Sequence, residues 1–444
     1  MHNISTDMKM PSISEVVDVL TAHTNKFGVP LDYDRMLEYQ AYFTMKGTAI
    51  KKRIIKYTGS TRSVDDYGDA DFLQFITNVG VSTGLQLTQK GNKISMGKDS
   101  LGAAIATGLY SDELNKLMEL YIEQGRCFKA ISSFKKIFEN HPIASIETFD
   151  NHRMIITKPT WVPQNTGRIG AQNPGLMNIS KDVHDIFTVP KGYVYLEVDS
   201  GQIEPRLIQS AYINDPQLKK CTMMYNDAYY GYVHYCRYLT DEQRRSGTLD
   251  LQPVPVTPEM EALRKKFKTF GNATMYGSTE NRLNDPDKAA FIKYIGGHPN
   301  RVKWQKRVED QIDRGQKIFY TIFGTPIDVT AGGEDDKYPD KESDAYFAHL
   351  VRTAINNPIQ GTAADLMRYS VLQADKLIST EAPNSFILQY VHDAGKFAIS
   401  EYEYDRVKDR IHEITAYQVD TWIPIYSGVE EGVIPSKDVK RFIV

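Results

Sequence analysis

The chain has 444 residues, of which 41% are hydrophobic and 25% charged, as in an ordinary globular protein with roughly two to four packed units. Its 53 Lys and Arg residues against 56 Asp and Glu give a formal net charge of −3. This balance excludes a polybasic binder, so any contact with nucleic acid has to come from local clusters of Lys and Arg. The three cysteines, Cys127, Cys221 and Cys236, are widely spaced, which excludes a disulfide framework and a CxxC zinc site.

The N-terminus lacks the apolar segment of a signal peptide, and no window of 18 apolar residues occurs. Secretion and membrane spanning are therefore not expected. A reducing, cytoplasmic location is the expectation, which would be the host cytoplasm if a phage encodes the protein.

The first elements in chain order are helical. Residues 12–56 have a helical pattern with a break at 28–30, and residues 111–138 carry apolar side chains at spacings of three, four and seven, which predicts a long amphipathic helix. The polar face of that helix is basic. Periodicity favours a solvated face over one that follows phosphates, and the residues concerned are Arg126, Lys129, Lys135 and Lys136.

Strands are predicted on both sides of a helix-rich region. Residues 193–199 alternate between apolar and polar and end at Asp199. Residues 386–391 and 397–399 are two apolar runs joined by a four-residue turn that carries His392 and Asp393 at its tip. The pattern predicts an α+β protein whose small antiparallel sheet holds the chemistry.

A cationic pair lies on the predicted helix that begins near residue 264. Arg264 and Lys268 are four residues apart, about 6 Å along a helix and nearly on one face, and this spacing suits a triphosphate. Asn272 and Tyr276 continue the four-residue spacing and drift toward a neighbouring face, where they can meet a sugar or a base. A basic surface helix is the simpler alternative.

Asp199 and Asp393 each follow a predicted strand. A single aspartate in such a place is most often a turn former or a cap. Two aspartates brought together by one sheet can instead hold two Mg²⁺ ions, which prefer oxygen ligands, with Mn²⁺ as a possible substitute.

Between these segments, Arg352, Asn356 and Gln360 are spaced to form one polar stripe on a helix. The amides of Asn and Gln fit the acceptors that every base pair presents in the minor groove of DNA. The same stripe can also simply face solvent.

In this order, these segments resemble the family A (DNA polymerase I-like) DNA polymerases. Residues 199–206 resemble motif A, residues 264–277 motif B of the fingers helix, and residues 391–393 motif C. Residues 356–365 are similar to the N-x-P-[IM]-Q-G-T-A-A-D helix, and residues 166–168 with 178–179 to the segment that opens the palm. The resemblance covers 166 to about 400. Before residue 166 only the arrangement of helices is similar.

The resemblance implies a fold shaped like a right hand, with a palm, fingers and a thumb. Its expected parts are an N-terminal helical segment (1–60), a thumb (61–150), a first palm part (151–216), the fingers (217–342) and a second palm part (343–444).

The resemblance also implies roles for individual residues. Asp199 and Asp393 would bind the two metal ions, with Lys268 also catalytic. The expected dNTP-binding residues are Arg264, Lys268, Asn272, Tyr276, Gln202 and Glu204, the last as a steric gate against a 2′-OH. The expected primer-template contacts are Arg168, Asn178, Arg352, Asn356, Gln360, His392, Arg126 and Lys129.

The chain also departs from the family pattern. Ser200 replaces a Tyr and Ala394 a Glu, and Asn272 stands where the family has Phe or Tyr. The remaining departures are Ala273 for Gly, and Gly175 and Met177 for an Asn and a Gln.

The leading hypothesis is a compact DNA polymerase of phage, plasmid or other mobile-element origin. It would extend a primer with dNTPs and release pyrophosphate, and no 3′–5′ exonuclease is expected because the thumb needs most of the chain before Thr166. Its partners would be primer-template DNA and dNTPs. The sequence indicates neither a membrane nor a particular processivity factor.

Two alternatives remain at this point. A single-subunit RNA polymerase is disfavoured by Gln202 and Glu204, because such enzymes lack the Glu gate. An inactive primer-template binder is suggested by Ser200, Asn272 and Ala394.

Overall fold

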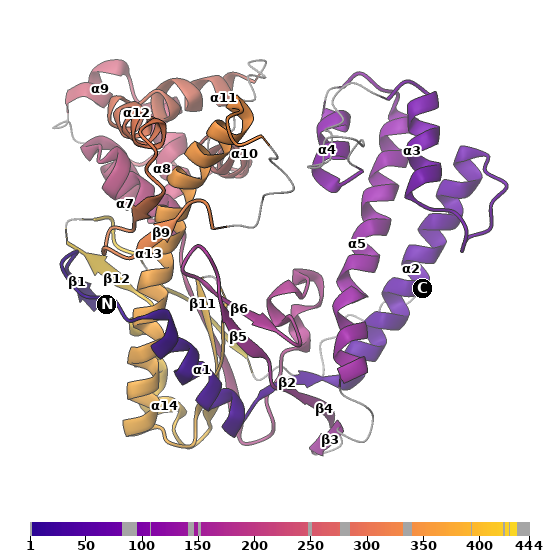
Figure 1. Ribbon diagram of the computed structural model, residues 1–444, viewed down its shortest axis with the longest axis horizontal. Helices are drawn as coiled ribbons and strands as arrows, with labels where there is room; N and C mark the ends of the chain where they lie inside the picture. The colour runs from indigo at the N-terminus through magenta and orange to yellow at the C-terminus, as the bar shows by residue number, and fades with distance from the viewer. Residues whose placement is uncertain are drawn as a thin grey trace.

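The computed structural model describes residues 2–81, 96–106, 108–140, 146–149, 152–246, 251–275, 285–331, 340–391, 393–420, 422–425 and 427–432. Two arms rise from a base that contains an antiparallel sheet (Figure 1). The combination of helices with small sheets confirms the predicted α+β class.

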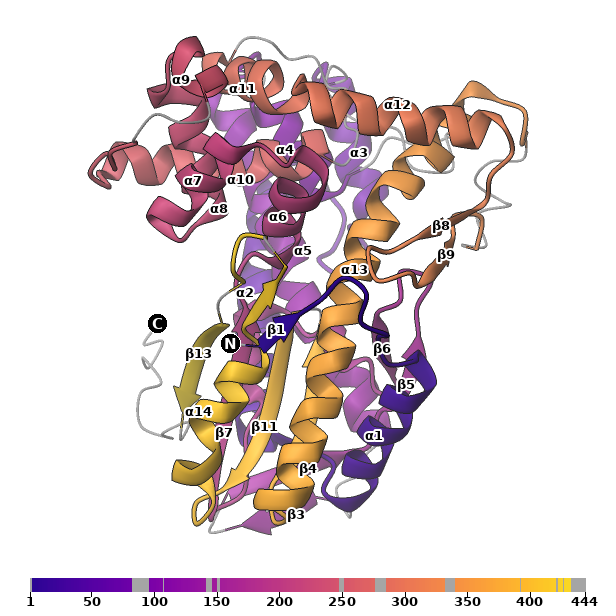
Figure 2. The ribbon, with the colours of Figure 1, turned by 90° about the vertical axis from the view of Figure 1, so that its left-hand side faces the viewer.

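Within the described residues the central sheet has four strands in the order β10-β11-β7-β13, all neighbours antiparallel. Their bounds are β7 (Tyr193–Ser200), β10 (Phe386–Val391), β11 (Ala394–Ser400) and β13 (Ser427–Gly432). The helices α13 (Asp344–Glu381) and α14 (Tyr404–Ile414) pack on one another and on this sheet (Figure 2).

The predicted strands at 193–199 and 386–391 are confirmed, but the predicted four-residue turn is wrong. Val391 already pairs with Ala394, so the hairpin connection is only His392 and Asp393. The turn is tighter because Ala394 and Gly395 also pair with β7 and are therefore strand residues.

One arm, called here the long-helix arm, comprises residues 33–140. Its helices are α2 (Tyr33–Thr58), α3 (Asp69–Asn78), α4 (Lys98–Ala106) and α5 (Asp112–Asn140). The predicted long helix at 111–138 is therefore confirmed as α5. It packs along α2, where Gly47 lies so close that a side chain there would meet the Phe128 ring, and Lys46 pairs with Glu123 at 2.6 Å.

The chain before this arm forms α1 (Ile13–Lys26), capped by Ser12, and then β2 (Val29–Asp32). The predicted break at 28–30 is thus the start of a strand. Small sheets complete the base and its edges: β2 with β3 (Ile146–Phe149) and β4 (His152–Thr157), β1 (His2–Ile4) with β12 (Tyr417–Val419), β5 (Thr160–Pro163) with β6 (Ile169–Gln172), and β8 (Ile318–Tyr320) with β9 (Pro326–Asp328).

The other arm, called here the insertion arm, comprises residues 203–313 between β7 and α13. Its α-helices are α6 (Ile203–Leu207), α7 (Pro216–Tyr225), α8 (Ala228–Val233), α9 (Asp241–Ser246), α10 (Pro258–Met275), α11 (Pro286–Phe291) and α12 (Pro299–Asp313). The arm has its own aromatic-rich core, which includes Tyr232, Phe267 and Phe291. The core of the long-helix arm is instead continuous with that of the central sheet.

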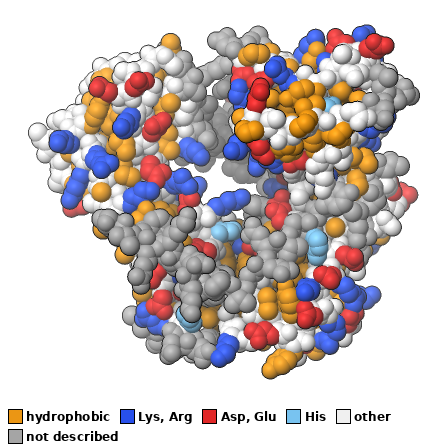
Figure 3. Space-filling view, turned by 180° about the vertical axis from the view of Figure 1, so that it is seen from behind, with side chains coloured by type: hydrophobic (Ala, Val, Ile, Leu, Met, Phe, Trp, Pro, Cys, Tyr) orange, Lys and Arg blue, Asp and Glu red, His pale blue; other side chains and the backbone are white. Residues whose placement is uncertain are grey.

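A hollow separates the two arms, and Lys and Arg side chains lie at its rim (Figure 3). The three cysteines are free and buried. In the part of the chain that the structure describes, no helix combines the length and the apolar character needed to cross a membrane.

Candidate active site

Asp199 and Asp393 are neighbours at one end of the central sheet. Asp199 pairs with Ala394 in the register of β7 and β11, and the backbone N–H of Ser200 donates to the carbonyl oxygen of Asp393 at 2.8 Å. The predicted pairing of these two aspartates by one sheet is therefore present.

The donor chemistry of this pair fits a hard divalent cation. Asp199 is exposed and Asp393 partly exposed, and each supplies a carboxylate. Among the described residues no group of three or more His, Cys, Asp or Glu side chains is placed to hold a metal ion.

The departure at Ser200 has a local explanation. Ser200 is fully buried, and its hydroxyl donates to the carbonyl oxygen of Thr415 at 2.9 Å. The hydroxyls of Ser200 and of the fully buried Tyr417 both lie 3.7 Å from Sδ of Met367. Tyr417 therefore fills space beside the small Ser200.

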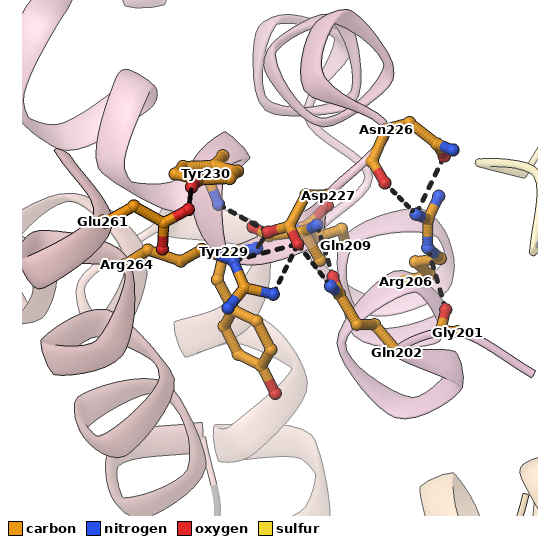
Figure 4. Close-up of polar contacts among 11 residues, drawn as sticks. Gly201, Gln202, Arg206, Gln209, Asn226, Asp227, Tyr229, Tyr230, Glu261 and Arg264 are labelled. Carbon is orange, nitrogen blue, oxygen red and sulfur yellow. Dashed lines mark hydrogen bonds and ion pairs between the residues drawn. The ribbon is translucent and has the colours of Figure 1, made fainter. Parts of the chain in front are cut away.

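A second group of polar residues joins the insertion arm to the loop after β7 (Figure 4). Oδ2 of Asp227 accepts from Nε and Nη2 of Arg264 at 3.0 and 2.6 Å, and also from Nε2 of Gln202. Oδ1 of Asp227 accepts from the backbone N–H groups of Tyr229 and Tyr230 at 2.9 and 2.8 Å, which caps α8.

Opposing effects act on the ionisation of this pair. Burial raises the pKa of Asp227, but the hydrogen bonds from Arg264, the Tyr230 backbone and Gln202 hold it below its usual value. Burial lowers the pKa of Arg264, and the hydrogen bond and charge of Asp227 more than offset this. Both groups are therefore charged at neutral pH.

Lys268 lies one turn after Arg264 on α10 and is exposed. Its Nζ is 5.9 Å from the centre of the Tyr229 ring, and the Arg264 guanidinium is 5.7 Å from the same ring. The predicted one-sided placement of the two cations is present. Burial, followed by the charges of Glu204 and Asp227, raises the pKa of Tyr229 to about 12, so its hydroxyl remains neutral.

Arg168 and Glu204 form an ion pair, although the resemblance gives them separate ligands. The segment that carries Arg168 is fixed by Arg368 of α13, whose Nη1 donates to the Gly167 carbonyl at 2.7 Å. Gly167 has φ +77, and a side chain there would lie 3.1 Å from that same Nη1, so glycine is required.

The polar stripe is on α13 as predicted, and Arg352, Asn356 and Gln360 are each partly exposed. Within the described part of the chain, Oδ1 of Asn356 is buried and has no hydrogen-bond partner. Such an atom is costly unless a ligand or water satisfies it.

Three further predicted primer-template residues, Arg126, Lys129 and Asn178, are on elements other than α13. Arg126 forms an ion pair with Asp182 through two hydrogen bonds, so its charge is used within the protein, whereas Lys129 and Asn178 are exposed. A Cβ at residue 175 would lie 3.0 Å from the Asn178 amide nitrogen, so Gly175 leaves room for that side chain.

Some predictions fall outside what the structure describes. His392 and Tyr276 are not among the described residues, and for Asn272 the helix backbone is described but the side chain is not. The roles implied for them stay predictions.

Sequence reasoning missed Asp227. An aspartate before the apolar run of residues 228–233 is a recognisable helix cap. Its pairing with Arg264 leaves no sequence signal, because the two residues are on separate helices.

The chain is similar to proteins of one known family. The family model of DNA polymerase family A matches residues 90–433. DNA polymerase I of Thermus filiformis is 26% identical over 293 residues, which cover 61% of this chain and 31% of that protein. DNA polymerase I of Pseudomonas aeruginosa is 24% identical over 281 residues, 60% of this chain and 28% of that protein. The chain thus spans less than a third of the length of these relatives.

A solved structure, the polymerase domain of Pol1 from M. smegmatis in complex with DNA primer-template and dNTP, is similar with a TM-score of 0.70. The match covers 94% of this chain and 69% of that one at 18% sequence identity, so it shows a shared fold.

Proposed function

The chain belongs to DNA polymerase family A, and from this premise we propose that it extends the 3′ end of a primer on a DNA template with dNTPs and releases pyrophosphate. The observation that supports this most is the sheet register, which places Asp199 beside Asp393 at the end of β7. Two carboxylates in that position suit catalysis assisted by metal ions.

We further propose that Asp199 and Asp393 hold two Mg²⁺ ions. When bound, these ions would activate the primer hydroxyl and stabilise the leaving pyrophosphate. Arg264 and Lys268 would bind the triphosphate through charge-assisted hydrogen bonds. Glu204, fixed by Arg168, would occupy the space that a ribose 2′-OH needs.

The stripe on α13 would contact the primer-template duplex. The amide N–H groups of Asn356 and Gln360 suit the acceptors that every base pair presents in the minor groove. In the same reading, the central sheet with α13 and α14 is the palm, the insertion arm forms the fingers, and the long-helix arm is the thumb. This places α2 in the thumb rather than in an N-terminal segment, because it packs along α5.

Primer extension on a defined template with Mg²⁺ tests the proposal. We expect extension with dNTPs, and a rate at least about a thousandfold lower for Asp199→Asn and Asp393→Asn, since charge stabilisation by a metal is worth several kcal/mol. Asp405→Asn is the matched control, because the Asp405 side chain is 91% exposed and pairs along α14 with Lys408.

Each alternative has its own outcome. Equal extension with rNTPs would favour an RNA polymerase. Tight binding of primer-template without extension, in a folded protein, would favour an inactive binder. Extension that survives both aspartate substitutions would refute the assigned site.

A further inference from the structure

We propose that Asp227 is a positioning residue that fixes the guanidinium of Arg264 for an incoming nucleotide triphosphate. The inference rests on the proposed polymerase function. It adds a residue outside every motif on which that function was based.

The geometry of the pair leaves Arg264 ready for a phosphate. Arg has five N–H donors, and Oδ2 of Asp227 takes one from Nε and one from Nη2. Within the described residues, the other three donors, two on Nη1 and one on Nη2, are not used by Asp227. A guanidinium held along one edge presents its other edge in a fixed direction, which is what bidentate recognition of phosphate needs.

Asp227 also joins Arg264 to the loop that carries Asp199. Gln202, three residues after Asp199, donates to Oδ2 of Asp227, and its own Oε1 accepts from the Ala228 N–H at 2.6 Å. Arg206 fixes the same corner, since its Nη2 donates to the Asn226 carbonyl at 2.7 Å (Figure 4). Arg264 on α10 is therefore connected, through Asp227 and Gln202, to the loop that follows Asp199.

The two oxygens of Asp227 have separable tasks. Oδ1 caps α8, whereas Oδ2 receives Arg264 and Gln202. Asn caps a helix as well as Asp does, so Asp227→Asn can keep the cap while an NH₂ group replaces the acceptor that faces Arg264. Asp227→Ser, also a good cap, removes that acceptor without adding a donor.

The chain offers a matched control on the other side of α10. Asp285 caps α11 by accepting from the Asp287 N–H at 2.9 Å, and it pairs with Nζ of Lys266 at 3.3 Å. Lys266 is two residues from Arg264, about 200° around the helix. Asp285→Asn therefore makes the matching change away from the proposed nucleotide site, because it can keep the cap of α11 while it removes the carboxylate that pairs with a cation of α10.

The test is single-turnover incorporation of one dNTP into a primer-template, measured against dNTP concentration, for the wild type, Asp227→Asn, Asp227→Ser, Arg264→Ala and the double variant Asp227→Asn/Arg264→Ala. We expect each Asp227 variant to weaken the apparent dNTP affinity about tenfold, the size of one hydrogen bond to a charged group. The maximal rate and the primer-template affinity should change much less. In the Arg264→Ala background, Asp227→Asn should add less than about twofold, because the two residues act as a pair. Asp285→Asn should leave the dNTP affinity unchanged.

Other outcomes overturn the inference. Unchanged dNTP affinity in folded Asp227→Asn and Asp227→Ser would do so, as would an equal loss with and without Arg264. In both cases the wild type still extends primers, so the polymerase function stands. A folded wild type that does not extend primers refutes the proposed function and this inference with it.

Discussion

The proposed site has two halves, which are held in place by different means. The sheet half is Asp199 with Asp393, and the arm half is Arg264 with Lys268 on α10. Asp199 and Asp393 are set by backbone pairing in the central sheet, whereas Arg264 is set by the side chain of one residue on another helix. The backbone pairing of the sheet half is present in this chain with Ser200 and Ala394 beside the two aspartates. The arm half depends on a single carboxylate, and losing it would leave a cation without a defined direction.

The largest effect that sharpens this comparison is expected at Lys268, an exposed cation of the arm half. Lys268→Ala should lower the rate of nucleotide incorporation about a hundredfold, because a preorganised charge near the reacting phosphates is lost. Lys265→Ala, an exposed lysine on another face of α10, should change the rate less than twofold. Equal losses in the two variants would show that α10 acts only as a basic surface.

Steric crowding in β11 can disrupt the sheet half while both aspartates remain unsubstituted. A Cβ at Gly395 would lie 2.8 Å from Cζ of Tyr390 and 3.0 Å from Cε2 of Phe397. Gly395→Ala should therefore cost about 1–3 kcal/mol in the free energy of unfolding, as overpacking does, and lower extension activity.

The control for this crowding is Gly102→Ala. Gly102 lies within α4, where an added Cβ meets nothing within 4 Å, so this change should be neutral or slightly stabilising. Urea unfolding measures both. A Gly395→Ala variant as stable as the wild type would show that the hairpin adapts to the extra methyl group.

The sequence predicted the sheet half better than the arm half for a physical reason. Alternation identifies a strand and its last residue, and register then brings Asp199 beside Asp393. The spacing of Arg264 and Lys268 likewise predicted one face of a helix. Neither pattern indicates which distant side chain pairs with a cation, so Asp227 and the Arg168–Glu204 ion pair required the structure.

Turn length was misjudged for a related reason. Ala394 and Gly395 have low strand propensity, and only their pairing with β7 makes them strand residues. The α+β class, the long helix α5 and the strands β7 and β10 followed from the sequence pattern, whereas the packing of α2 along α5 depends on small contacts such as that at Gly47.

Glu204 lies between the two halves, just after β7 and at the start of the insertion arm. Glu204→Ala should reduce the discrimination of dNTPs against rNTPs about tenfold, the scale of selectivity that a pocket gains from a small steric difference. Competition between dNTP and rNTP measures it. Arg168→Ala should reduce discrimination less, because Glu204 itself remains. A larger effect of Arg168→Ala would place the sugar discrimination at the arginine instead.

The smallest expected effect is that of mild acid, which should lower the stability of the protein without changing the charges of the Asp227–Arg264 pair. Burial, followed by the charge of Lys396 on β11 of the central sheet, lowers the pKa of His184 from 6.5 to about 4. Between these values the unfolded chain binds a proton that the folded one does not, so the stability contributed by neutral His184 is lost as the pH falls from 6.5 toward 4. Asp227, whose pKa is held below its usual value, stays ionised at pH 5.5.

His184→Gln removes this proton uptake. The difference in unfolding free energy between wild type and variant should therefore move by about 1 kcal/mol in favour of the variant from pH 7 to pH 5.5. Because the Asp227–Arg264 pair keeps its charges over this range, the apparent dNTP affinity of the folded enzyme should follow the nucleotide's own titration. If the dNTP affinity and the stability fall together, and His184→Gln abolishes both losses, then the arm half depends on the central sheet.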